Sequence, residues 1–367
     1  MPFPQHRNRL WIFLLLFAGG CASDYPPSGG AGDTQPLQVI SSQPAPESTE
    51  VTTSTIRLTF NRDISEKALF NSVHITPTIG TYDIVHVGKS VDIKPEQPFA
   101  ANQTYTLTLD KQVKDMKGRS LPSPYHLAFS TGKDIDRGNI SGMVFYADFS
   151  PASNALLLAF NTNNTKDECN NLLAKEPNYR IEADASGAFS FQNIANGKYR
   201  IIAVNDRNND KCYTNESEEI GVGSITLIPT GTTNVWLRFP KANKAIAPQE
   251  KSSESPTETG SIAGQIVAHG RYVIIEAESA TRTYRTIASH PKNTTFLYVF
   301  PTLPAGSYTI SAYLPSSTKT AATLQDWNPG SIHPFHPADP FGFYPEKVRV
   351  RGRWKTDNIN ITIETLR

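Results

Sequence analysis

Apolar and polar residues alternate along most of the chain. Between positions 37 and 132 the apolar residues fall at every second position in short runs, for example at Ile56, Leu58 and Phe60. A period of two places successive side chains on opposite faces and predicts half-buried β-strands. Groups of Pro, Gly, Asn and Asp separate the runs at a spacing typical of a two-sheet sandwich. The pattern therefore predicts an all-β protein.

Several motifs in this region follow one another in a characteristic order. They are Ser42-Gln43-Pro44, the runs 56–64, 102–107 and 113–118, and the closing Phe129-Ser130-Thr131-Gly132. Together they resemble the bacterial Ig-like domain of the SbsA type over the whole of residues 37–132. The resemblance implies an Ig-like sandwich that acts as a spacer, stalk or adhesive module and has no catalytic residues.

The regions 138–239 and 260–367 contain the same motifs in the same order. Gly142 corresponds to Gly264 at an offset of 122, Tyr199 to Tyr308 at 109, and Val235 to Ile359 at 124. Such self-similarity indicates an internal repeat with loops of different length. Both copies resemble the small prealbumin-like or carboxypeptidase-regulatory-like sandwich. Residues 240–259 have no aromatic residue and are predicted to be the linker between them.

The N-terminus has the pattern of an export signal. Basic residues precede an apolar run of nine residues, 10–18, which is too short to span a bilayer. The run leads into Gly19-Gly20-Cys21, which resembles the lipobox of bacterial lipoproteins. The resemblance implies a signal peptide over 1–20, diacylglycerol and palmitate on Cys21, and a flexible tether over 21–36. An ordinary signal peptide, with Cys21 as a free or paired thiol, is the alternative.

The residues after Cys21 bear on the compartment. Ala22 and Ser23 follow it without an adjacent Asp, which by resemblance to lipoprotein sorting rules favours the outer membrane. The membrane would then be a partner through the N-terminal lipid. Thirty-five Lys and Arg against thirty-four Asp and Glu leave a net charge of +1, so the chain has no field that would attract nucleic acid.

One loop of the second copy carries oxygen side chains at alternate positions. Asp206, Asn208 and Asp210, with Glu218 downstream, are the ligand types that calcium prefers. A standard EF-hand is excluded because Lys211 stands where the loop needs Gly. The possible cofactor is therefore Ca²⁺ in a different loop geometry. Alternatively, the same Asp and Asn side chains form turn hydrogen bonds.

Cys169 and Cys212 both lie in the second copy. An exported protein folds where thiols are oxidised, so we predict a disulfide between them. Two buried thiols are the alternative. No His lies between residues 127 and 268, so the sequence does not favour a catalytic Cys.

Residues 327–354 are rich in aromatic side chains. Trp327, Phe335 and Tyr344 could stack on sugar rings, or they could close a core beneath a long loop. The spacing His333-x-x-His336-x-x-Asp339 could serve zinc, but the flanking prolines favour a rigid surface loop.

Basic residues alternate on the strand that follows. Lys347, Arg349, Arg351 and Arg353 favour a solvated strand edge over an anion site.

These patterns predict a non-catalytic protein of the cell envelope. We expect three tandem β-sandwich modules, Ig-like and then prealbumin-like, held at the outer membrane by lipid and serving in structure or adhesion. Its partner would be an envelope protein or a glycan. The alternatives are an accessory subunit of a surface-assembly, secretion or glycan-uptake complex and, less favoured, an enzyme with a site in the loop 327–345. The nucleophile-elbow, His-Glu-x-x-His and phosphate-loop motifs are all missing from the sequence.

Overall fold

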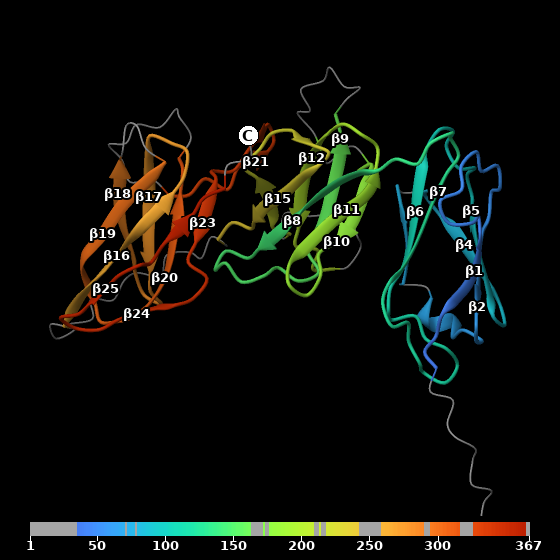
Figure 1. The fold of residues 1–367 in the computed structure, drawn as a ribbon, viewed down its shortest axis with the longest axis horizontal. Helices are drawn as coiled ribbons and strands as arrows, with labels where there is room; N and C mark the ends of the chain where they lie inside the picture. The colour runs from blue at the N-terminus through green and yellow to red at the C-terminus, as the bar shows by residue number, and fades with distance from the viewer. Residues whose placement is uncertain are drawn as a thin grey trace, which may run out of the picture. The chain divides into compact units, whose positions relative to one another are not determined.

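A computed structural model describes most of the residues of the chain. Their regular elements are strands, apart from one short 3₁₀ helix, η1 (Glu66–Ala68) (Figure 1). The predicted all-β class is therefore confirmed. Within the described residues, no helix has the length and apolar character needed to cross a membrane. By its contacts, Leu37–Arg367 forms one compact unit. The described residues are 35–69, 72–77, 79–162, 172, 176–208, 213, 218–241, 258–289, 294–315 and 326–364.

The first module, residues 37–132, contains two sheets. Their strand orders are β1-β2-β5-β4 and β3-β6-β7. The alternating residues Ile56, Leu58 and Phe60 of β2 are fully buried between the sheets, as the period of two requires. The strands are β1 (Val39–Gln43), β2 (Ile56–Phe60), β3 (Val73–Thr76), β4 (Tyr82–Val87), β5 (Ser90–Pro95), β6 (Thr104–Leu109) and β7 (Tyr125–Ser130).

The second module, residues 138–239, is one continuous sheet with strand order β10-β9-β12-β13-β15-β8-β11. Its two layers are joined because β13 pairs with both β12 and β15. β14 also pairs with β12. The core lies between the layers, with Tyr199 and Phe191 among its largest side chains. The strands are β8 (Gly138–Phe145), β9 (Leu156–Asn161), β10 (Tyr179–Glu182), β11 (Ala188–Ile194), β12 (Lys198–Val204), β13 (Ile220–Gly223), β14 (Ile228–Pro229) and β15 (Thr232–Arg238).

The third module, residues 260–367, has two main sheets. One contains β19-β16-β25 with β26 also on β16, and the other contains β18-β17-β20-β23 with β24 also on β20. A short hairpin, β21-β22, is separate from both. The strands are β16 (Thr259–Val267), β17 (Tyr272–Glu278), β18 (Thr283–Ser289), β19 (Thr295–Pro304), β20 (Gly306–Tyr313), β21 (Ser331–Ile332), β22 (Phe335–His336), β23 (Phe341–Phe343), β24 (Val348–Val350), β25 (Lys355–Thr356) and β26 (Ile361–Thr362).

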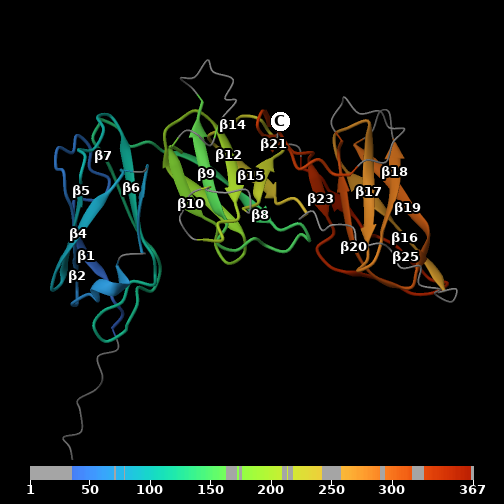
Figure 2. The same cartoon turned by 180° about the vertical axis from the view of Figure 1, so that it is seen from behind.

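The strand pairing of the second module recurs in the third. β8 pairs antiparallel with β11 and parallel with β15, and β16 does the same with β19 and β26 (Figures 1 and 2). β12 pairs with β9, β13 and β14, just as β20 pairs with β17, β23 and β24. The two modules therefore share one topology.

Equivalent residues make equivalent contacts in the two copies. The Tyr199 hydroxyl donates to the Ala195 carbonyl at 2.6 Å, and the Tyr308 hydroxyl donates to the Pro304 carbonyl at 2.8 Å. Each tyrosine ties its strand to the preceding turn from inside the core. Because a buried hydroxyl needs a partner, this bond explains why the repeated Gly-x-Tyr motif contains Tyr.

Candidate functional site

Several strands of the second and third modules are buried on both faces. The outward-facing residues of β8 and β15 and those of β17, β20 and β23 form a second apolar cluster, separate from the two cores. We call this cluster the aromatic contact. It comprises Phe145, Phe149, Ile274, Tyr313 and Phe341, with the partly buried Met143, Trp236, Ile287, Trp327 and Phe343 against it.

Arg238, at the end of β15, lies inside the aromatic contact and is only 4% exposed. Its guanidinium carbon lies 4.0 Å from the ring centroid of Phe149, 4.6 Å from that of Trp327 and 5.8 Å from that of Phe341. Its Nη2 donates to the Ala147 carbonyl at 2.5 Å. Burial lowers the pKa of Arg238 to about 10. Desolvated cation–π contacts of this kind stabilise by about 2 kcal/mol or more.

Charged and backbone groups complete the contact between the modules. On the third module's side of the contact, Glu276 on β17 is buried, and Nε of Arg285 on the neighbouring β18 donates to its Oε1 at 2.7 Å. The Lys241 ammonium donates to Glu278 Oε2 at 2.7 Å. A backbone hydrogen bond also joins the two modules, from the Ala338 N–H to the Gly223 carbonyl at 3.1 Å. The buried Glu276 carboxylate therefore has a charged partner, whereas Arg238 is held by the Ala147 carbonyl and the aromatic rings.

The β21-β22 hairpin makes a second contact. Its Ile332 and Phe335 pack on an apolar cluster formed by β9 and β12, and the guanidinium of Arg200 lies 4.9 Å from the ring centroid of Phe335. The buried residues of that cluster are Leu156, Leu158, Phe160, Leu172, Ile202 and Val204. A hairpin of the third module thus covers a sheet face of the second.

The predicted sugar-binding aromatics do not converge. Trp327 is half-buried against Arg238, and its Nε1 donates to the Asp339 carbonyl at 2.8 Å. Phe335 packs on the second module, while Tyr344 packs against the core of the third. Trp327 and Phe335 are therefore partly buried against strands of the second module, in line with the packing alternative raised by the sequence. Glycan binding stays a prediction.

The predicted zinc residues His333, His336 and Asp339 lie in the turn of the β21-β22 hairpin, on β22 and just after it. The His336 Nδ1 lies 3.1 Å from the Ser331 hydroxyl, and Asp339 Oδ2 accepts from the Asn328 N–H at 3.1 Å. The described residues hold no group of three or more His, Cys, Asp or Glu arranged for a metal.

The predicted calcium loop is only partly described. Asp206, Asn208 and Glu218 lie in described residues, and Glu218 is 4% exposed, whereas Asp210 lies outside. Cys21, Cys169 and Cys212 also lie outside the described residues. The lipid, the disulfide and the calcium site therefore stay predictions.

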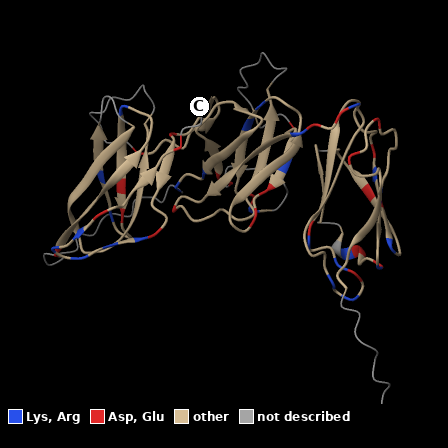
Figure 3. Cartoon of the chain, viewed as in Figure 1, with Lys and Arg blue, Asp and Glu red and all other residues tan. Residues whose placement is uncertain are grey.

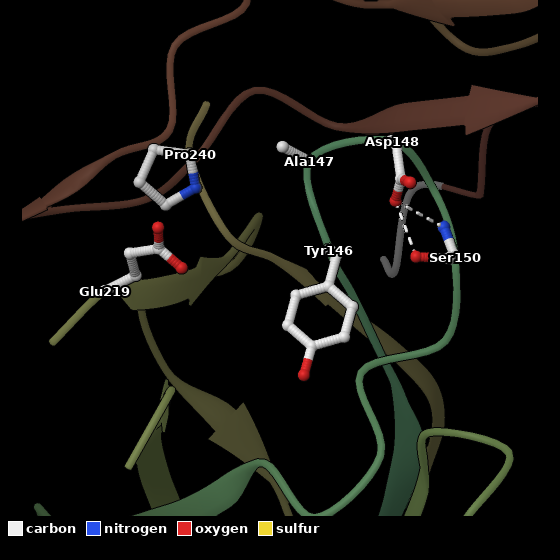
Figure 4. Close-up of a pocket in the computed structure, with 6 residues that line it drawn as sticks. All are labelled: Tyr146, Ala147, Asp148, Ser150, Glu219 and Pro240. Carbon is white, nitrogen blue, oxygen red and sulfur yellow. Dashed lines mark hydrogen bonds between the residues drawn. The ribbon is translucent and has the colours of Figure 1, made fainter. Parts of the chain in front are cut away.

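The second module also has an open hollow of about 320 Å³ (Figure 4). Asp148 in it accepts from the Ser150 hydroxyl at 2.6 Å and from the Ser150 N–H at 3.0 Å. The hydroxyl bond holds the pKa of Asp148 below its usual value. The Tyr146 hydroxyl points away from Asp148, and Glu219 lies beside Pro240 (Figure 4). The six residues drawn there do not form an acid–base pair.

Comparison with known proteins identifies the class of the first module. Residues 33–131 match the family described as the bacterial Ig-like domain. No curated protein matches the chain. The protein is thus all-β, with an Ig-like first module, a class that fits a structural or adhesive role.

The similar solved structures include a bacterial S-layer protein and two pilins. The N-terminal part of the bacterial S-layer protein SbsC is 13% identical, with 55% of this chain and 42% of that one covered and a TM-score of 0.21. The major pilin subunit BcpA of Bacillus cereus is 10% identical, with 57% and 71% covered and a TM-score of 0.18. The streptococcal ancillary pilin is 8% identical, with 78% and 82% covered and a TM-score of 0.19. The chain spans less than half of the SbsC structure.

Sequence reasoning missed the role of Arg238. A signal was present, because continuous apolar runs such as Val273-Ile274-Ile275 indicate strands buried on both faces. The alternation of Trp236 and Arg238 on β15 could likewise have indicated a covered outer face.

Proposed function

We propose that the protein is a non-catalytic envelope lipoprotein. A lipid on Cys21 would hold it at the outer membrane, the Ig-like module would act as a spacer, and the joined second and third modules would present a binding surface. The observation that carries this proposal is the bacterial Ig-like match at 33–131, which follows the lipobox-like Gly19-Gly20-Cys21 after a short polar stretch. The alternative roles, an accessory subunit and an enzyme, are distinguished from it by a pull-down and by a turnover measurement.

The internal contacts of the protein support a structural role. Three buried charged groups make contacts within the fold: Asp115 accepts from Arg119 at 2.7 Å, Glu276 accepts from Arg285, and Arg238 donates to the Ala147 carbonyl. The aromatic contact restrains the second and third modules against each other. A rigid pair keeps its outer surfaces in fixed positions, which reduces the entropy lost on binding a partner.

Lipid attachment is tested by growth with an alkyne-bearing palmitate analogue. The wild-type protein should be labelled and should sediment with outer membranes, whereas Cys21→Ala should be unlabelled. Cys169→Ala is the matched control and should be labelled like the wild type. Equal labelling of Cys21→Ala would contradict the anchoring.

The partner is tested by a crosslinked pull-down from intact envelopes through a tag after Arg367. One dominant protein that is lost with Cys21→Ala would identify an accessory subunit of that protein's complex. Enrichment of a glycan would support adhesion. Turnover of a substrate by the purified chain would refute the proposal.

A further inference from the structure

The third module carries a dense run of basic side chains. Lys347, Arg349, Arg351, Arg353 and Lys355 occupy alternate positions with no acidic residue between them, although the whole chain has a net charge of only +1. All five are exposed. Figure 3 marks basic positions along the segment from β24 to β25. We call residues 347–355 the basic tip.

Few acidic groups neutralise the basic tip. Arg353 lies 3.4 Å from Glu258 in a pair whose side chains are 85% and 63% exposed, so the pair is weak. Lys355 lies 2.8 Å from Asp357. In the described part of the chain, Arg349 and Arg351 have no ion pair. The tip therefore keeps a net positive charge.

An exposed tryptophan lies in the same turn. Trp354 is 67% exposed. The turn is fixed by backbone bonds to β16: the Arg353 N–H donates to the Thr259 carbonyl at 2.7 Å, and the Ser261 N–H donates to the Trp354 carbonyl at 2.9 Å. A Cβ on Gly260 would lie 2.3 Å from the Arg351 carbonyl oxygen, so this close approach requires glycine. These backbone contacts fix the conformation of the basic tip.

The repeat shows that the fold does not need these charges. Tyr308 on β20 pairs with Val348, and its counterpart Tyr199 on β12 pairs with Ile228. By this register, Pro229 and Gly231 of the second module occupy the positions of Arg349 and Arg351. The same topology thus forms with neutral residues at these positions. The basic residues are a property of the third module alone.

We propose that the basic tip binds a bilayer surface rich in anionic phosphate headgroups. Arginine and lysine are attracted to such a surface, and tryptophan favours the level of the headgroups, where its ring is partly apolar and its N–H stays hydrated. A soluble polyanion would use the charges but would give Trp354 no apolar region to enter. The tip is a second membrane contact that does not depend on the lipid at Cys21.

The test uses residues 22–367 without lipid, because Leu37–Arg367 forms a compact unit with its own cores. The chain should co-sediment with vesicles of equal parts phosphatidylglycerol and phosphatidylcholine, and not with phosphatidylcholine alone. Neutralising one arginine should weaken binding about fivefold, and the triple variant Arg349→Gln/Arg351→Gln/Arg353→Gln about a hundredfold. Salt should weaken wild-type binding as well.

Matched variants distinguish binding by the basic tip from an effect of the overall charge of the chain. Lys89→Gln/Lys111→Gln/Lys133→Gln removes the same charge from exposed sites in the first module and directly after it, and should bind like the wild type. A triple Arg→Lys variant should keep most of the binding. The tryptophan emission should shift to the blue on anionic vesicles, and Trp354→Phe should abolish the shift. Circular dichroism confirms that each variant is folded.

Three results would overturn the proposal. They are undiminished binding by the folded triple Gln variant, equal binding to neutral vesicles, and binding of a soluble polyanion such as polyphosphate in preference to vesicles. Since the chain used has no lipid, a failure of the palmitate analogue to label the full wild-type protein would refute the proposed anchoring and leave this result unchanged.

Discussion

At the scale of single residues, two glycines mark the points where the repeated sheets leave no room for a side chain. A Cβ on Gly142 would lie 1.8 Å from the Val235 carbonyl oxygen, and one on Gly264 would lie 1.9 Å from the Ile359 carbonyl oxygen. Neither glycine has a positive φ. The requirement is therefore one of space between parallel strands and not of backbone conformation.

We expect Gly264→Ala to destabilise the third module by about 1–3 kcal/mol, because the added methyl must push β16 away from residue 359. Thermal unfolding followed by circular dichroism measures the loss. Gly306→Ala is the control, since its Cβ would meet nothing closer than 3.7 Å. Equal melting temperatures for the two variants would contradict the steric explanation.

A second residue-scale prediction concerns pH. Burial alone would raise the pKa of Asp115, but hydrogen bonds from the backbone and side chain of Arg119 and from the Lys117 N–H hold that pKa below its usual value. A lowered carboxyl pKa adds stability above the unfolded-state pKa of about 4. That stability is lost as the pH falls through the folded-state pKa.

Hydrogen exchange of β6 and β7 measures this effect. Their protection should decrease as the pH is lowered from neutral to below 4, after correction for the intrinsic exchange rate. Asp115→Asn should cost about 1–3 kcal/mol at neutral pH, because an NH2 group replaces one of the two acceptor oxygens and the charge that Arg119 faces is lost. The variant should also show a weaker pH dependence. Asp134→Asn, at an exposed site, is the control, and identical pH profiles for Asp115→Asn and the wild type would refute the assignment.

At the scale of elements, the β21-β22 hairpin belongs to one module and stabilises another. Its Phe335 covers the apolar outer face of β9 and β12. We expect Phe335→Ala to lower hydrogen-exchange protection in those two strands, by about 1–3 kcal/mol for a partly buried ring. Leu297→Ala is the control because Leu297 is 74% exposed. A loss of protection confined to the third module would show that the hairpin does not support the second.

The same element shows why the aromatic loop was open to two readings. Phe335 and Trp327 are apolar residues in a segment rich in proline and glycine, a pattern that suits a binding loop and a covering loop equally well. The sequence around these residues does not reveal which sheet face they contact. Only the position of β9, β12 and β15 decides between the two.

At the scale of the whole molecule, the second and third modules share the aromatic contact around Arg238. We expect them to unfold in a single calorimetric transition. Arg238→Ala should remove about 2 kcal/mol or more of cation–π stabilisation and split the transition in two. Arg282→Ala, at an exposed position, should leave it single. Two separate transitions for these modules in the wild-type protein would contradict the coupling.

The sequence by itself determined the all-β class, because the period of two is a local property of the chain that any half-buried strand must obey. It also determined the Ig-like nature of the first module, through motifs that follow one another in a fixed order from residue 42 to residue 132. The matched positions of Gly142 and Gly264 were visible in the same way.

Only the tertiary structure decided how the second and third modules meet. Arg238 and Trp327 are far apart in sequence, and no local pattern states that they touch. A strand face that is apolar in sequence requires a cover, but many elements could provide it. Which element does so depends on the loops and strand order that bring it there, and this is the reason that the folded chain was needed to assign the aromatic loop.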